Sequence, residues 1–208
     1  MTEPWPGELE EEGRREDGRV EPDRLDTIPA SDEVAAAEAP QHAAGVLDIP
    51  DDVDVLEGQA GDVRRSVAIV VAKFNADITS KLLAAALDEL DRLDVDRARI
   101  LVVPVPGAFE LPLAAMALAK TRRYTCVVAL GCVIRGETPH FDYVASEAAS
   151  GLQVAALETG VPVAFGVLTT EDVEQAEARI AKGAEAVRTA LEMADLFAHL
   201  RRTAAAQA

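Results

Sequence analysis

Short apolar runs alternate with longer amphipathic stretches from residue 66 onward. The runs are rich in β-branched residues, which is typical of strands buried on both faces. They predict strands at 67–72, 100–103, 126–130 and 161–168, with Gly131 ending the third. The stretches between them have helical spacing and predict helices at 78–93, 111–120, 141–157 and 184–200, with another starting after 171–172. This alternation predicts an α/β fold, a three-layer sandwich with a central parallel sheet.

The N-terminal segment has a different composition. Residues 1–62 hold 19 acidic and 4 basic side chains, and few large apolar ones. Such a segment cannot bury enough surface to offset the entropy of ordering, so we expect an acidic, disordered leader at 1–52. The domain is predicted at 53–208, and 53–56 is a candidate edge strand.

Composition limits which partners and which cellular compartment the protein can be expected to have. The net charge of -17 disfavours nucleic acid and anionic membranes as partners. No apolar stretch reaches the roughly 20 residues of a membrane span, and the N-terminus does not resemble a secretory signal. Cys126 and Cys132 lie in or beside an apolar run without metal-ligand spacing, which predicts reduced, buried thiols. We therefore expect a cytoplasmic protein.

Ligands of parallel α/β sheets bind at the carboxyl ends of the strands. This rule selects four segments, at 74–75, 106–110, 131–140 and 165–170. The third contains two glycines and Thr138 just before a helix, where backbone amides can bind an anion. It has neither a dinucleotide nor an NTP fingerprint, so a plain strand–helix connection explains it equally well. Arg135 and Arg179 are cations near this edge or solvated surface side chains.

Four other side chains allow two interpretations each. His140 follows the glycine-containing segment and suits proton transfer at neutral pH, or it caps a helix. Phe74 either stacks on a planar ring or covers the sheet edge. Glu110 either binds hydroxyl groups or stabilises a helix N-terminus. Phe165 lies within an apolar strand, so position alone favours the core.

Taken together, these segments resemble the lumazine synthase family in order and spacing. The matching segments are 71–75, 78–79, 105–112, 131–144 (GCVIRGETPHFDYV), 162–170 and 174–179. The resemblance implies a flavodoxin-like subunit that condenses 5-amino-6-(ribitylamino)uracil with 3,4-dihydroxy-2-butanone 4-phosphate, without metal or organic cofactor. It also implies a homopentamer, often assembled into a 60-subunit icosahedral capsid, with active sites between subunits and riboflavin synthase as a further partner.

The resemblance assigns the ring-bearing substrate to aromatic side chains and main-chain groups. Phe74 stacks on the pyrimidine, and Phe165 of an adjacent subunit closes the pocket. The ribityl chain is held by Ala108, Phe109 and Glu110. The edge of the pyrimidine is bound through the main chain of Cys132, Val133 and Ile134.

The phosphate-bearing substrate is assigned to the segment before the third predicted long helix. Glu137 and Thr138 bind its phosphate, and Arg179 of the adjacent subunit completes the phosphate site. His140 transfers protons during the condensation. Further candidates by the same resemblance are Asn75, Lys182 and Glu185.

The chain departs from the family after Arg179. Only Ile180 and Ala181 precede Lys182, where the family has a longer loop rich in Gly, Lys and Asn. This leaves three hypotheses: the enzyme, a shell or scaffold protein of the same fold that has lost activity, and a module that binds phosphate or pterin without turnover. Phe74, Glu110, Thr138, His140 and Arg179 together favour the enzyme.

Overall fold

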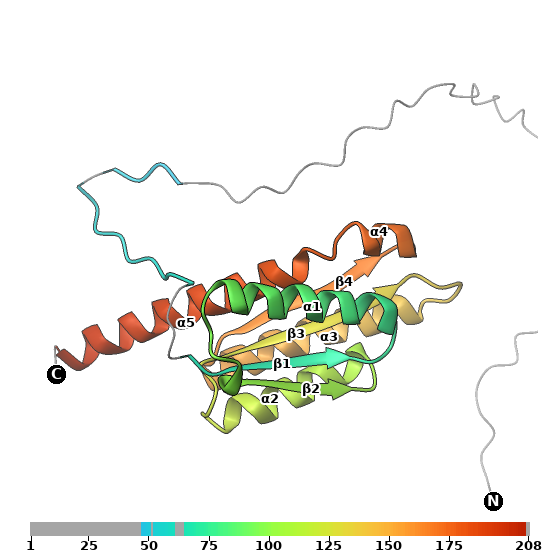
Figure 1. Ribbon diagram of the computed structural model, residues 1–208, viewed down its shortest axis with the longest axis horizontal. Helices are drawn as coiled ribbons and strands as arrows, with labels where there is room; N and C mark the ends of the chain where they lie inside the picture. The colour runs from blue at the N-terminus through green and yellow to red at the C-terminus, as the bar shows by residue number, and fades with distance from the viewer. Residues whose placement is uncertain (1–46, 51, 61–64, 207–208) are drawn as a thin grey trace, which may run out of the picture. The chain divides into compact units, whose positions relative to one another are not determined.

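The computed structural model describes residues 47–50, 52–60 and 65–206 (Figure 1). The chain divides into two units, 1–49 and 50–208, and the fold below belongs to the second. Most of the predicted leader, 1–52, lies outside the described residues, so its disorder and its boundary stay predictions.

A four-stranded parallel sheet forms the centre of the domain, in the order β2-β1-β3-β4 (Figure 1). Its strands are β1 (Val67–Ala72), β2 (Ile100–Val105), β3 (Cys126–Ile134) and β4 (Val163–Thr170). Every residue of β1 is buried, as its unbroken β-branched run predicts. The predicted parallel sheet of a flavodoxin-like α/β fold is confirmed.

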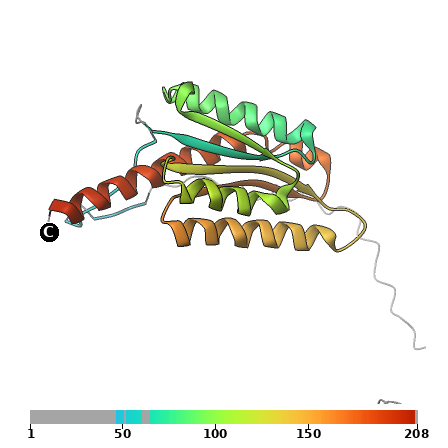
Figure 2. The same cartoon turned by 90° about the horizontal axis from the view of Figure 1, so that it is seen from below.

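Helices cover both faces of the sheet, which confirms the three layers (Figure 2). They are α1 (Ala76–Arg92), α2 (Leu111–Lys120), α3 (His140–Thr159), α4 (Val173–Glu177) and α5 (Lys182–Ala206), with 3-10 turns η1 (Arg97–Arg99) and η2 (Ala108–Glu110). Helices α1 and α5 pack on one face, and α2 and α3 pack on the other. Each layer buries its own cluster of mainly Ala, Val and Leu side chains.

Close backbone approaches hold both helical layers together. A Cβ on Gly151 of α3 would lie 2.7 Å from the Cβ of Pro112 in α2, so these helices need a glycine there. Gly183 of α5 lies directly against the carbonyl of Leu82 in α1. Such close packing restricts movement of the helices against one another, so the ends of the strands are held in fixed positions.

Several predicted boundaries were wrong. Strand β3 does not end at Gly131 but continues to Ile134, paired with β4 throughout. The glycine serves packing instead, because a side chain there would crowd Leu111 of α2 and Val167 of β4. Strand β2 runs past Pro104 to Val105, which an edge strand tolerates. Residues 53–56 form no strand, and Val53 and Val55 are exposed.

Two expectations from composition can be compared with the fold. Cys126 and Cys132 are buried and free, as predicted. Burial raises the pKa of both thiols, that of Cys132 to about 11, so neither is a thiolate at neutral pH. In the described part of the chain, no helix has both the length and the apolar character needed to span a membrane.

Candidate active site

The carboxyl ends of β1 and β3 lie side by side at the centre of the sheet. The chain leaves β1 toward α1 on one face, whereas the segments after β2 and β3 lead to α2 and α3 on the other. Such a switch point leaves a crevice between the two connections. Asn75 bridges it, because its Nδ2 donates a hydrogen bond of 2.9 Å to the carbonyl oxygen of Cys132. Asn75 also has left-handed backbone and caps α1.

A cavity of about 450 Å³ opens at this switch point. It brings together most of the residues that the sequence had selected. Those are Phe74, Asn75, Ala108, Phe109, Glu110, Cys132, Val133, Ile134 and His140. They come from three of the four segments that strand direction selected, 74–75, 106–110 and 131–140, whereas the fourth, 165–170, contributes no lining residue.

Two main-chain hydrogen bonds fix Phe74 at the rim. The amides of Lys73 and Phe74 donate to the carbonyls of Val105 and Pro106, at 2.8 and 3.1 Å, and so extend the β1–β2 pairing beyond the strands. The Phe74 side chain is nevertheless 70% exposed, and Phe109 opposite it on η2 is 57% exposed. Two exposed aromatic rings beside one cavity suit a planar ligand, which favours stacking over edge covering as the role of Phe74.

The Glu110 carboxylate lies at the junction of η2 and α2. It is half-buried, and a Cβ on Gly107 would lie 3.2 Å from its Oε2. Glycine therefore leaves the room that lets this carboxylate bend back over the turn. The carboxylate can accept hydrogen bonds from hydroxyl groups in the cavity.

His140 is the first residue of α3 and lines the same cavity. The connection before it is shorter than predicted, because β3 extends to Ile134. Glu137 and Thr138 lie in this connection and are exposed, but neither lines the cavity. A phosphate site in this connection, before the N-terminus of α3, stays a prediction.

Besides Glu137 and Thr138, four further predicted site residues lie outside the cavity. Phe165 is 47% exposed on edge strand β4, so the prediction that it is a core residue was wrong. It shares a strand face with Val163 and Val167, and no helix of the described chain covers it there. Arg179 is exposed, and its Nη1 donates to the carbonyl of Gln175 at 2.8 Å.

Lys182 and Glu185 are the other two. The Nζ of Lys182 lies 2.7 Å from both carboxylate oxygens of Glu185, one turn along α5. The short connection after Arg179 consists of consecutive tight turns that lead directly into α5. The two side chains therefore neutralise each other instead of reaching the cavity of the same subunit.

Three further residues line the cavity without having been predicted individually: Gly107, Tyr143 and Val144. Tyr143 and Val144 follow His140 by three and four positions on α3, the spacing that places side chains on one helix face. That spacing could have identified them. Within the described residues, no group of three or more His, Cys, Asp or Glu side chains is arranged to hold a metal ion.

Comparisons with known proteins agree with this geometry. The family model described as 6,7-dimethyl-8-ribityllumazine synthase matches residues 64–198. The chain is 52% identical over 151 residues to the 6,7-dimethyl-8-ribityllumazine synthase of Yersinia pestis (strain Pestoides F), and the match covers 70% of this chain and 97% of that protein. The protein of the same description from Yersinia pseudotuberculosis serotype O:1b (strain IP 31758) matches with the same identity and coverage.

Proposed function

Because the chain belongs to the 6,7-dimethyl-8-ribityllumazine synthase family, we propose that it condenses 5-amino-6-(ribitylamino)uracil with 3,4-dihydroxy-2-butanone 4-phosphate. The products are 6,7-dimethyl-8-ribityllumazine, phosphate and water, in the penultimate step of riboflavin biosynthesis. The observation that carries this proposal is the cavity at the β1–β3 switch point, where Phe74, Glu110 and His140 converge.

The cavity chemistry suits the ring-bearing substrate. Phe74 stacks on the pyrimidine, and the main chain of 132–134 binds its polar edge. Glu110 and the turn at 108–110 hold the ribityl hydroxyls. Each of these roles rests on family resemblance, and the exposure and position of the side chains support them.

The reaction needs several proton transfers. The ring amine attacks the ketone, the carbinolamine loses water, and phosphate is eliminated. The second amine then attacks the remaining carbonyl, and loss of a second water completes the ring. His140 is the group that moves protons, which contributes about 10²–10⁴-fold to the rate. Holding the two substrates together contributes much of the remaining effect. Thr138 and the amides before α3 receive the phosphate.

A single subunit supplies only part of the site. Phe165 and Arg179 lie away from the cavity and are exposed, which supports their serving the cavity of an adjacent subunit. Family membership implies oligomerisation, and we propose a pentamer that can assemble further into a 60-subunit shell, with riboflavin synthase as a partner. The buried, reduced cysteines are compatible with a cytoplasmic enzyme.

One observation favours a second candidate, a shell or scaffold protein without turnover. The short connection after Arg179 leaves Lys182 paired with Glu185 in α5, so this ammonium group is already engaged. The scaffold hypothesis attributes the fold to assembly alone and predicts no reaction.

Turnover separates the two candidates. The purified full chain is mixed with both substrates, and the absorbance and fluorescence of the lumazine product are followed against the spontaneous reaction. Product formation well above that background is expected. A folded, assembled protein that gives only background would exclude the enzyme and leave the scaffold.

A further inference from the structure

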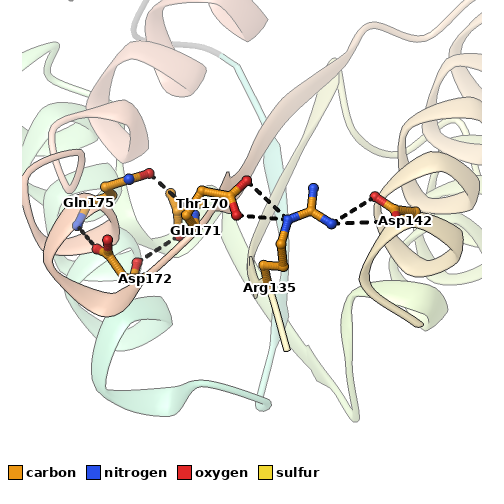
Figure 3. A network of polar contacts seen from close by, with 6 residues as sticks. All are labelled: Arg135, Asp142, Thr170, Glu171, Asp172 and Gln175. Carbon is orange, nitrogen blue, oxygen red and sulfur yellow. Dashed lines mark hydrogen bonds and ion pairs between the residues drawn. The ribbon is translucent and has the colours of Figure 1, made fainter. Parts of the chain in front are cut away.

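Arg135 follows the last residue of β3 and lies between two parts of the site. Its amide extends the pairing with β4 by donating to the carbonyl of Thr170 at 2.9 Å. Its guanidinium then contacts carboxylates on both sides, Glu171 after β4 and Asp142 in the first turn of α3 (Figure 3). The side chain is therefore not a solvated surface arginine, although 41% of it is exposed.

Three contacts fix the orientation of this guanidinium. The Nε atom lies 2.8 Å from Glu171 Oε2, and Nη1 lies 3.3 Å from Asp142 Oδ1. The Cζ atom lies 4.3 Å from the centre of the Phe141 ring, a cation–π distance. Hydrogen bonding to Glu171, together with the charges of Glu171 and Asp142, raises the pKa of Arg135. With two carboxylates and a ring around it, Arg135 is engaged by the protein and is not an open phosphate ligand.

These contacts enclose the connection that carries Glu137 and Thr138. Arg135 stands at its first end, and Phe141 and Asp142 stand just beyond its second end, after His140. The amide of Asp142 also donates to the carbonyl of Pro139 at 3.0 Å. Arg135 thus ties both ends of the connection to each other and to the end of β4.

A second chain of hydrogen bonds leads from Glu171 to Gln175 (Figure 3) and from there to Arg179. The amide of Glu171 donates to Oε1 of Gln175, and the amide of Gln175 donates to Oδ1 of Asp172 at 2.7 Å. The carbonyl of Gln175 in turn accepts from Nη1 of Arg179 at 2.8 Å. The element that presents Arg179 is thus connected to the carboxylate that holds Arg135.

We propose that Arg135 is a positioning residue for the phosphate-bearing substrate. It holds the 135–139 connection and the first turn of α3 in the conformation that binds phosphate, and it links them through Glu171 to the turn after α4 that carries Arg179. It touches no substrate itself. This inference rests on the proposed function, because the phosphate it serves belongs to that reaction.

The principal test is the variant Arg135→Ala, with each Michaelis constant measured separately. We expect the KM for the butanone phosphate to rise about 10-fold and kcat to fall a few-fold, since misplaced binding groups lose transition-state contacts. The KM for the ribitylaminouracil should stay within about twofold of wild type. Arg135→Lys keeps the positive charge but lacks the planar guanidinium that contacts both carboxylates. It should therefore show a smaller rise in this KM than Arg135→Ala.

Partner variants test whether the effect passes through Glu171. Glu171→Gln should raise the same KM by a smaller factor, and the double variant Arg135→Ala/Glu171→Gln should be no worse than Arg135→Ala alone. Arg97→Ala is the matched control, because Arg97 is an exposed arginine whose Nε donates to Asp91 at 2.9 Å near the opposite end of the sheet. It should leave both Michaelis constants unchanged.

Inorganic phosphate provides a readout that does not depend on turnover. Its dissociation constant, measured by calorimetry, should rise about 10-fold in Arg135→Ala relative to wild type, in step with the KM effect. If both Michaelis constants rise equally in Arg135→Lys and Glu171→Gln, or if phosphate binds equally to wild type and Arg135→Ala, the proposal is wrong. A wild type without turnover would refute the proposed function, and the phosphate comparison would still decide the role of Arg135.

Discussion

The two ends of the sheet carry hollows that differ in size and in chemistry. The amino-end hollow is larger, about 690 Å³, and its lining includes Asp96, Arg99, Arg123 and Tyr124. The carboxyl-end hollow, about 450 Å³, is lined largely by apolar and aromatic groups with few polar side chains. Volume alone would select the wrong end. Strand direction and lining chemistry select the carboxyl end, because parallel sheets bind ligands there and binding cavities are mostly apolar with a few directed polar groups.

Charged side chains pair with one another at both ends, as Arg135 does with Glu171 and Asp142 at the carboxyl end, but the exposure of aromatic side chains differs. Near the amino end Glu89 pairs with Arg92 and Arg188, and Arg97 pairs with Asp91. At the carboxyl end, the aromatic side chains of Phe74, Phe109 and Tyr143 remain exposed, and the exposed Arg179 donates a hydrogen bond to the carbonyl of Gln175. Uncovered aromatics favour association, which supports the proposal that a ligand and a neighbouring subunit complete this end.

The largest expected effect comes from Arg179. Replacing Arg179 with Ala should lower kcat/KM for the butanone phosphate about 1000-fold, since a cation at a departing phosphate stabilises the transition state. Steady-state kinetics with the ribitylaminouracil saturating would measure it. Arg123→Ala is the matched control, an exposed arginine at the amino-end hollow, and it should change kcat/KM less than about twofold. Equal losses of kcat/KM in Arg179→Ala and Arg123→Ala would mean that the two ends of the sheet do not differ in their contribution to the reaction.

A smaller effect is expected at His140. His140→Ala should lower kcat about 100-fold without abolishing the reaction, because proton transfer is lost while the substrates are still held together. Single-turnover measurement of product formation would isolate this step. Unchanged turnover would exclude His140 from the mechanism.

Phe74 should affect binding more than chemistry. Phe74→Ala should raise the KM for the ribitylaminouracil about 10-fold, as loss of one stacking contact does, and Phe74→Trp should retain the stacking. The melting temperature should hardly change, because the side chain is already 70% exposed. A large loss of stability with an unchanged KM would show that Phe74 covers the sheet edge instead.

At the amino end the expected effect is on stability and not on activity. Hydrogen bonding from Arg92, followed by that from Arg188, lowers the pKa of the buried Glu89 carboxyl to about 2. Since the folded pKa is depressed, this stabilisation is present above the unfolded value near 4.5 and is lost as pH falls toward 2. Glu89→Gln should therefore cost about 2 kcal/mol of unfolding free energy at pH 7.

Denaturant unfolding of Glu89→Gln and wild type over this pH range would measure the difference. It should shrink as the pH drops below about 4.5, while kcat at neutral pH stays the same. A difference in stability that is constant with pH would mean that the carboxylate charge contributes nothing.

Local pattern and strand direction were enough to predict the layers and most of the cavity. The buried run at 67–72 and the helix at 111–120 were found with their observed bounds, because burial and helical spacing leave a clear periodicity. Gly131 was misread, since a glycine that relieves crowding between two packed layers has the same sequence signature as one that ends a strand. Such crowding depends on side chains distant in sequence.

Phe165 and Arg135 show a second reason why the sequence could not predict the whole site. Phe165 looked like a core residue because its neighbours in sequence are apolar, but β4 is an edge strand and its face at Phe165 is uncovered. Arg135 looked like a surface cation, and only the fold brings Glu171 and Asp142 to it. Strand order and long-range pairing are absent from local periodicity.

The central claim, that the carboxyl end holds half of a site and a neighbouring subunit supplies the rest, can be tested by mixing subunits. One variant would carry Phe74→Ala and His140→Ala, and the other Phe165→Ala and Arg179→Ala, so that each alone is nearly inactive. Random co-assembly leaves about a quarter of the interfaces with both halves intact, and we predict about that fraction of the wild-type rate. A mixture no more active than its separate components would contradict the shared site.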